Sequence, residues 1–175
     1  IANRTEALKV LTEELFRYSV ISSVSDLSYE KVNVGRVLED TLISFYGAFE
    51  QKNITPNISL PDGVIIRSLD KSALSRIFGN IISNAVKYSD GDFSVTMTDA
   101  GEITFSNTAS ELSSVDVGKL FDRFYTVDSA RKSTGLGLSI AKLLTERMRG
   151  YISADYKGNT LSITLSFEGE KYENK

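Results

Sequence analysis

Residues 76–89 of this 175-residue chain are RIFGNIISNAVKYS, and this stretch decides what kind of domain the sequence can form. It belongs to a helix predicted to begin after Asp70, a good helix N-cap, and to end near Tyr88. Apolar residues recur along one face at helical spacing: Leu74, Ile77, Phe78, Ile81, Ile82 and Ala85. A helix with one apolar face needs a packing partner, so we expect a second layer against it.

The same helix carries a row of polar side chains. Asn80, Asn84 and Lys87 stand at i, i+4 and i+7, so all three point the same way. A carboxamide oxygen suits a hard cation such as Mg²⁺, and a lysine charge suits a nucleotide phosphate. The alternative from the pattern alone is a solvated polar stripe on a surface helix.

A second unusual stretch, residues 133–138 (STGLGL), leads directly into a helix predicted from Thr134 to about Met148. Glycines let the backbone approach a phosphate closely, and the helix N-terminus offers unpaired N–H donors. Gly150 is expected to stop this helix. Taken alone, the glycine pair is equally compatible with a tight turn.

The remaining pattern predicts helices and strands in mixed succession. A helix over residues 1–21 has one apolar stripe, which either docks on its own domain or belongs to a helical bundle. A polar linker and a short strand precede a second helix over residues 34–51. Strands are predicted at residues 55–60, 64–67, 93–98, 102–106, 151–156 and 160–167. This order predicts an α+β fold, a two-layer α/β sandwich with an antiparallel-rich sheet.

The composition excludes several functions. A net charge of −3 and a pI near 5.1 give no basic field for nucleic acid. The chain has no Cys and no His, which excludes disulfides, thiolate chemistry, imidazole bases and His-based metal sites. It contains no apolar run of about 18 residues, so we expect no membrane contact by this chain.

Together the two glycine- and asparagine-bearing stretches resemble the catalytic domain of sensor histidine kinases, within the wider GHKL ATPase superfamily. Residues 80–89 match that family's N box, residues 121–125 (FDRFY) its F box and residues 134–138 its second glycine box. The resemblance covers roughly residues 33–167, and the run 121–150 is most similar to kinases that sense peptide antibiotics.

The resemblance implies a protein histidine kinase domain that binds ATP and Mg²⁺. Asn84 would ligate Mg²⁺, with Asn80 supporting the metal and the phosphates. Lys87 would act with Asn80 in catalysis by contacting the phosphates, and Tyr88 would pack on the adenine or ribose. The second glycine box would surround the phosphates through Thr134, Gly135, Leu136, Gly137 and Leu138.

Residues 107–133 would form the lid over ATP, anchored by Phe121 and Phe124, with Arg131 contacting a phosphate. Plain core packing for the two phenylalanines and a solvated charge for Arg131 stay open as alternatives. Hydrolytic members of the superfamily place Glu where this chain has Asn80. A carboxamide cannot act as a base, so ATP here would be held for transfer rather than hydrolysed.

The chain departs from the family in its first glycine box, Asp-x-Gly-x-Gly, which here is residues 107–111 (NTASE). Asn107 would therefore read the adenine amino group without a charge, and the lid would hinge more stiffly at Ala109 and Glu111. Because its amide could also rotate to donate to guanine O6, Asn107 predicts weaker discrimination of ATP from GTP.

The resemblance also implies an organisation. Residues 1–22 would end the dimerisation helix, 23–32 would be a linker, 33–168 the ATP-binding domain and 169–175 a flexible tail. The acceptor His would lie upstream, in a membrane-anchored parent whose catalytic domain is cytoplasmic. The parent would dimerise through these helices and pass its phosphate to a response regulator. A nucleotide-binding regulatory module and an anti-sigma-factor serine kinase are the alternatives.

Overall fold

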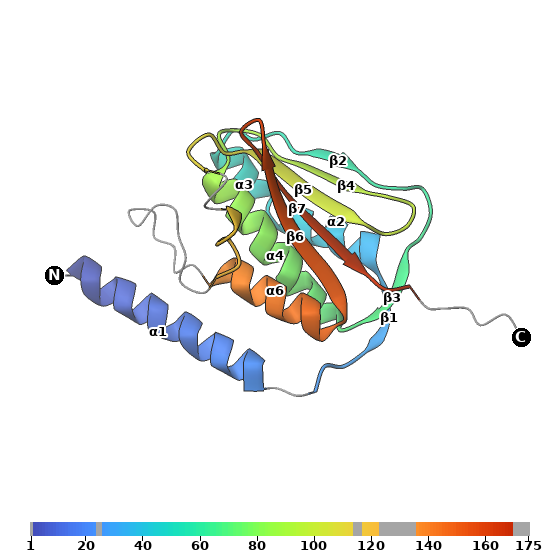
Figure 1. Cartoon of the computed structure of the whole chain (residues 1–175), viewed down its shortest axis with the longest axis horizontal. Coiled ribbons are helices and arrows are strands. Elements are labelled where there is room, and N and C mark those ends of the chain that lie inside the picture. Colours follow the sequence, from blue (N-terminus) through green and yellow to red (C-terminus); the bar gives the residue numbers. More distant parts are fainter. Residues whose placement is uncertain (1, 24–25, 114–116, 123–135, 170–175) are drawn as a thin grey trace, which may run out of the picture.

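The computed structural model of the chain describes residues 2–23, 26–113, 117–122 and 136–169 (Figure 1). A five-stranded sheet forms one layer, and helices cover one of its faces. The strand order is β2-β4-β5-β7-β6, with β2 (Asn57–Ser59) parallel to β4 (Ser94–Met97) and every other neighbour antiparallel. The other three strands are β5 (Ile103–Thr108), β6 (Gly150–Lys157) and β7 (Thr160–Phe167).

The helical layer consists of α2 (Val34–Ser44), α3 (Tyr46–Gln51), α4 (Lys71–Tyr88) and α6 (Gly137–Arg147). A separate two-stranded ribbon pairs β1 (Glu30–Asn33) with β3 (Ile66–Leu69) in antiparallel fashion. The α+β two-layer sandwich predicted from the sequence is confirmed.

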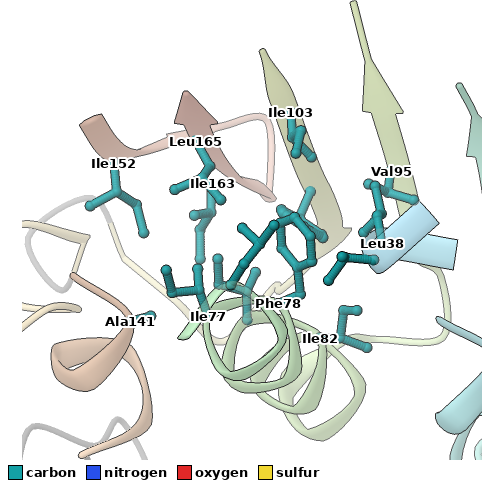
Figure 2. Close-up of a cluster of buried hydrophobic side chains, with 14 of the residues drawn as sticks. Leu38, Ile77, Phe78, Ile82, Val95, Ile103, Ala141, Ile152, Ile163 and Leu165 are labelled. Atoms are coloured by element: carbon teal, nitrogen blue, oxygen red, sulfur yellow. The ribbon is translucent and has the colours of Figure 1, made fainter. Parts of the chain in front are cut away.

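The core lies between α4 and the sheet. Figure 2 shows Ile77 and Phe78 of α4 facing Ile103 of β5 and Ile163 and Leu165 of β7. All five side chains are buried. Ile77 and Phe78 belong to the apolar face of α4, and strand alternation sends every second residue of β5 and β7 toward the helices. This packing fixes α4 against β5, and so fixes the polar row on α4 relative to the end of that strand.

The first helix, α1 (Ala2–Ser23), lies outside the sandwich (Figure 1). Its Leu8 and Leu15 are 63% and 45% exposed, so the apolar stripe is not docked on the chain's own domain at these positions. Among the described residues, none of the helices combines the length and the apolar character needed to cross a bilayer.

Three local predictions need correction. The helix predicted over residues 34–51 is two helices, because the Phe45 N–H donates to the carbonyl of Leu42, 3.1 Å away. This tighter turn redirects the chain, and Phe49 becomes buried. The predicted helix stop at Gly150 is also wrong. Arg149 takes the left-handed conformation (φ 57°), and Gly150 begins β6, where a Cβ would lie 2.6 Å from the Phe167 ring.

The third correction concerns Asn107 and Thr108, which were assigned to the lid. Both belong to β5, where they pair with Leu161 and Thr160 of β7. The polar character of these two residues hid the strand, whereas their ladder with β7 extends it two residues beyond the predicted end.

Candidate functional site

The site is built on α4, whose start is fixed by Asp70. The carboxylate of Asp70 accepts a hydrogen bond from the Ala73 N–H at 2.9 Å, as an N-cap should. From that start, helical periodicity buries the apolar face and leaves Asn80, Asn84 and Lys87 half-buried along one edge. The polar row is therefore neither fully solvated nor part of the core.

Asn80 joins the two stretches that the sequence singled out. Its Nδ2 donates a hydrogen bond to the backbone oxygen of Gly137, 3.0 Å away, across 57 positions of the chain. Gly137 is the first residue of α6, so this bond fixes the start of α6 beside the polar row of α4. The separate predictions of a polar stripe and of a glycine turn thus concern one place in the fold.

The start of α6 has the features of a phosphate-binding helix N-terminus. Leu136, the N-cap, is apolar and supplies no side-chain cap in this part of the described chain. Helical bonding begins with Ile140, whose N–H donates to the Leu136 oxygen at 2.9 Å. The N–H groups of the first turn can therefore be offered to an anion, with the helix dipole favouring negative charge.

Gly137 leaves the approach to that turn open. A Cβ built on it would meet nothing within 4 Å, so packing does not require a glycine here. By contrast, the side chains of Leu136 and Leu138 are buried in the core, at 0% and 6% exposure. Of these two leucines, only the backbone groups can bind a ligand, so their predicted role is limited to backbone contacts.

Asn107 lies at the end of β5, on the face of the sheet that α4 covers. Its side chain is only 4% exposed and follows Ile103 and Phe105 in the buried alternation of the strand. Its Nδ2 donates to the oxygen of Thr108 at 3.1 Å. A carboxamide held in this way through one N–H directs its oxygen to the opposite side, and an acceptor oxygen is what reading an adenine amino group requires.

Lys87 and Tyr88 lie in the last turn of α4. The Lys87 Nζ lies 5.8 Å from the centroid of the Tyr88 ring, within cation–π range. Both side chains are half-buried. A lysine here also stabilises the negative end of the helix dipole, which is an additional structural role for Lys87.

Similarity to known proteins identifies the family of the chain. A family model described as "Histidine kinase-, DNA gyrase B-, and HSP90-like ATPase" matches residues 69–169, more than half of the chain and all of the site. The chain belongs to this ATPase family. Sensor histidine kinase WalK of Bacillus subtilis (strain 168) is 31% identical to it over 187 residues, covering 98% of this chain and 30% of WalK.

Solved structures agree on the fold of the ATPase domain. Full-length ShkA in complex with AMPPNP superposes with a TM-score of 0.76 at 21% identity, covering 90% of this chain and 35% of ShkA. Histidine kinase ThkA, in complex with response regulator protein TrrA, gives 0.73 at 16% identity, covering 94% and 48% of the two chains. The chain spans 30% to 57% of the lengths of the first three curated relatives it matches.

The residues predicted to form the F box and the second glycine box are only partly described. Phe121 is half-buried against the core, and the Lys142 Nζ of α6 lies 5.9 Å from its ring centroid. Phe124, Arg131, Thr134 and Gly135 lie outside the described residues, so their roles stay predictions.

Sequence reasoning missed the contacts of the turn that follows α4, residues 89–92. In this turn, which the sequence predicts, Asp90 accepts from the backbone N–H of Ser110, and Asp92 accepts from that of Thr108. The available signal was two carboxylates in a short turn next to the N box, but nothing in the pattern shows which backbone they reach.

Proposed function

We propose that the chain binds Mg·ATP and that the full-length protein transfers the γ-phosphate to a histidine of its dimerisation domain. From there the phosphate would pass to an aspartate of a response regulator. The observation that carries the proposal is the Asn80–Gly137 hydrogen bond, since it joins the polar row of α4 to the uncapped start of α6. A nucleotide's phosphates fit between such a row and such a helix start.

Each residue of the site would bind a different part of Mg·ATP. Asn84, supported by Asn80, would hold Mg²⁺, which would supply positive charge against the phosphates. Lys87 would contact the terminal phosphates, and the backbone of Gly137 would approach them. Asn107 would accept from the adenine amino group. Half-buried carboxamides beside an open glycine fit a hard cation and its phosphates.

The identity of residue 80 favours transfer over hydrolysis. The Asn80 Nδ2 donates to a carbonyl oxygen, a bond that a deprotonated glutamate could not make. A carboxamide also cannot take a proton from water. The rate would then depend on positioning and electrostatics around the γ-phosphate, as phosphoryl transfer generally requires.

The proposal includes the organisation of the parent protein. Residues 1–22 would end a dimerisation helix, and 23–32 would link it to the ATP-binding domain at 33–168. The tail predicted at 169–175 lies, beyond Gly169, outside the described residues. Exposed Leu8 and Leu15 on α1 support packing of this helix in a homodimer. A response regulator partner is supported by the ThkA–TrrA complex. The parent would be membrane-anchored, with this domain in the cytoplasm.

A regulatory module that binds nucleotide without transferring phosphate is the second candidate. Two hydrogen bonds donated by backbone N–H groups favour this second candidate, and both lie in the segment where the family's first glycine box is expected. The Ala109 N–H donates to the Asn159 oxygen at 2.7 Å, and the Ser110 N–H donates to Asp90 Oδ2 at the same distance. The segment is therefore more restrained than a glycine box.

Two measurements separate these functions. Isothermal titration of the purified chain with ATP, in Mg²⁺ and again in excess EDTA, tests metal-dependent binding. Phosphorylation of a separately supplied dimerisation domain containing the acceptor histidine tests transfer. We expect binding and slow transfer, but no acid-labile phosphate on this chain, because it has no His. Binding without transfer would favour the regulatory module, and acid-labile phosphate on this chain would refute the histidine kinase assignment.

A further inference from the structure

Thr108, the last residue of β5, is held from the turn that follows α4. Asp92 Oδ1 accepts hydrogen bonds from the Thr108 N–H at 2.7 Å and from the Thr108 hydroxyl at 2.6 Å. On its other side, the Thr108 carbonyl oxygen accepts from the Asp90 N–H at 2.9 Å. Both peptide groups of Thr108 are thus fixed by residues 90 and 92.

The turn itself is closed by Ser89. The Ser89 hydroxyl accepts from the Gly91 N–H at 3.0 Å and from the Asp92 N–H at 2.9 Å. Its own proton is shared between the Asp92 backbone oxygen and Asp92 Oδ1, which lies 3.1 Å away. Gly91 has a φ of 137°, a conformation that side chains rarely adopt. The carboxylates of Asp90 and Asp92 are therefore presented by a defined turn rather than by a loose loop.

The same network orients Asn107. The Thr108 oxygen that accepts from the Asp90 N–H also accepts from Asn107 Nδ2, at 3.1 Å. Rotating the amide by half a turn would place Oδ1 against that oxygen with no proton between them, which is repulsive. The position of the Thr108 carbonyl therefore decides which end of the buried Asn107 amide faces a ligand.

We propose that Asp92, together with Asp90, is a positioning residue for base recognition: through Thr108 it holds the Asn107 amide with its oxygen toward the nucleotide. Asn107 then presents its acceptor oxygen to the ligand and favours a base that carries an amino group at position 6. Rotation toward guanine O6, which the sequence alone allowed, is opposed by this bond. The proposal deepens the proposed function and rests on it.

The charge state of Asp92 is compatible with this role. Burial raises the pKa of the Asp92 carboxyl, but hydrogen bonds from the Thr108 hydroxyl and N–H and from the Ser89 hydroxyl outweigh it and lower the pKa below 3.8. The group is thus an ionised acceptor at neutral pH, and its bonds to Thr108 are charge-assisted.

The test compares Mg·ATP with Mg·ITP, whose base has an oxygen at position 6 where adenine has the amino group. We expect the intact chain to prefer ATP, and Asp92→Ala to reduce that preference by about fivefold, the worth of one hydrogen bond. Asp92→Asn keeps an acceptor oxygen for Thr108 and should retain the preference within about twofold. Asp99→Ala removes the same charge from the exposed far tip of the β4–β5 hairpin and should change nothing.

A second variant and a measurement without nucleotide test the proposal even if Asp92→Ala misfolds. Thr108→Val removes only the hydroxyl bond to Asp92 and should reduce the preference by about twofold. In the chain without nucleotide, hydrogen exchange of the Asn107 side-chain amide and the Thr108 N–H should accelerate in Asp92→Ala and stay slow in Asp99→Ala.

The outcomes distinguish a failure of the positioning role of Asp92 from a failure of the proposed ATP binding. If Asn107→Ala abolishes the preference while Asp92→Ala leaves it and the exchange rates unchanged, ATP binding stands and the positioning role is refuted. If the intact chain binds neither nucleotide, the proposed function fails, and base selection fails with it. Accelerated exchange in Asp92→Ala would then support only the orientation of the amide.

Discussion

Replacing Asn80 by Asp keeps the size and shape of the side chain but exchanges its N–H donor for a charged acceptor. The Nδ2 that donates to the Gly137 oxygen at 3.0 Å becomes a carboxylate oxygen facing that carbonyl. The loss of one hydrogen bond costs about 1 kcal/mol, and the repulsion between the two oxygens adds to it. Because Asn80 is half-buried, water relieves part of that repulsion, so we expect a total of about 1–2 kcal/mol.

For a chain of this size, such a loss lowers the thermal midpoint by about 3–6 °C. Asn84→Ala is the matched control, since it removes the carboxamide one turn further along the same helix edge. Alanine favours helix more than asparagine, so Asn84→Ala should melt at or slightly above the wild-type temperature. Only its Mg²⁺-dependent ATP binding should be lost.

Thermal unfolding followed by circular dichroism, paired with ATP titrations in Mg²⁺ and in EDTA, checks both variants. If Asn80→Asp melts like the wild type, the bond to Gly137 does not join α4 to α6 and the reasoning about the site geometry is wrong. If Asn84→Ala folds normally and binds Mg·ATP as the wild type does, the polar row is only a solvated face.

Three further changes have expected outcomes. Lys87→Ala should weaken ATP about tenfold and ADP less in competition titrations, because a charge-assisted contact to the terminal phosphate is lost; equal losses would place Lys87 away from that phosphate. Arg67→Ala should lower stability by about 2–3 kcal/mol in urea unfolding, because its guanidinium donates to the oxygens of Ile66, Ala100 and Phe167; a wild-type midpoint would contradict this. Asp92 has a lowered folded pKa, so its stabilisation is present above about pH 3.8 and is lost as the pH falls through the folded value. Asp92→Asn should flatten the fall of the melting temperature below pH 4, and an unchanged slope would show that other carboxyls govern it.

Local signals predicted the helices that carry the site. Asp70 and the apolar spacing gave both ends of α4, because capping and periodicity depend on neighbours within a few residues. The same reasoning failed at Phe45, where α2 gives way to α3. There the core buries the ring of Phe49 and only partly buries that of Phe45, which helical periodicity alone does not predict. It also failed at Arg149, a left-handed position that sequence statistics assign to glycine.

The sequence predicted which residues form the candidate site, but not which residues they contact. The row of Asn80, Asn84 and Lys87 follows from helical spacing alone. The hydrogen bonds from Asn80 to Gly137 and from Thr108 to Asp92 join residues that are 16 or more positions apart. No local pattern encodes such contacts, since they result from how the sheet and the helical layer are assembled.

The degenerate glycine box and the restrained end of β5 are two aspects of one structural change. Ala109 is buried in a small cluster with Leu112 and Leu161, so its methyl group packs where a glycine would leave a gap. Its N–H is bonded to the Asn159 oxygen, and its own oxygen accepts from the Tyr156 hydroxyl at 3.0 Å. A glycine here would lose the packing and widen the conformations open to the backbone. The backbone after Asn107 is thus restrained, and for the base recognition proposed above a neutral amide needs fixed geometry more than a carboxylate does. Both carboxylate oxygens accept, whereas a carboxamide accepts only if the correct end faces the base.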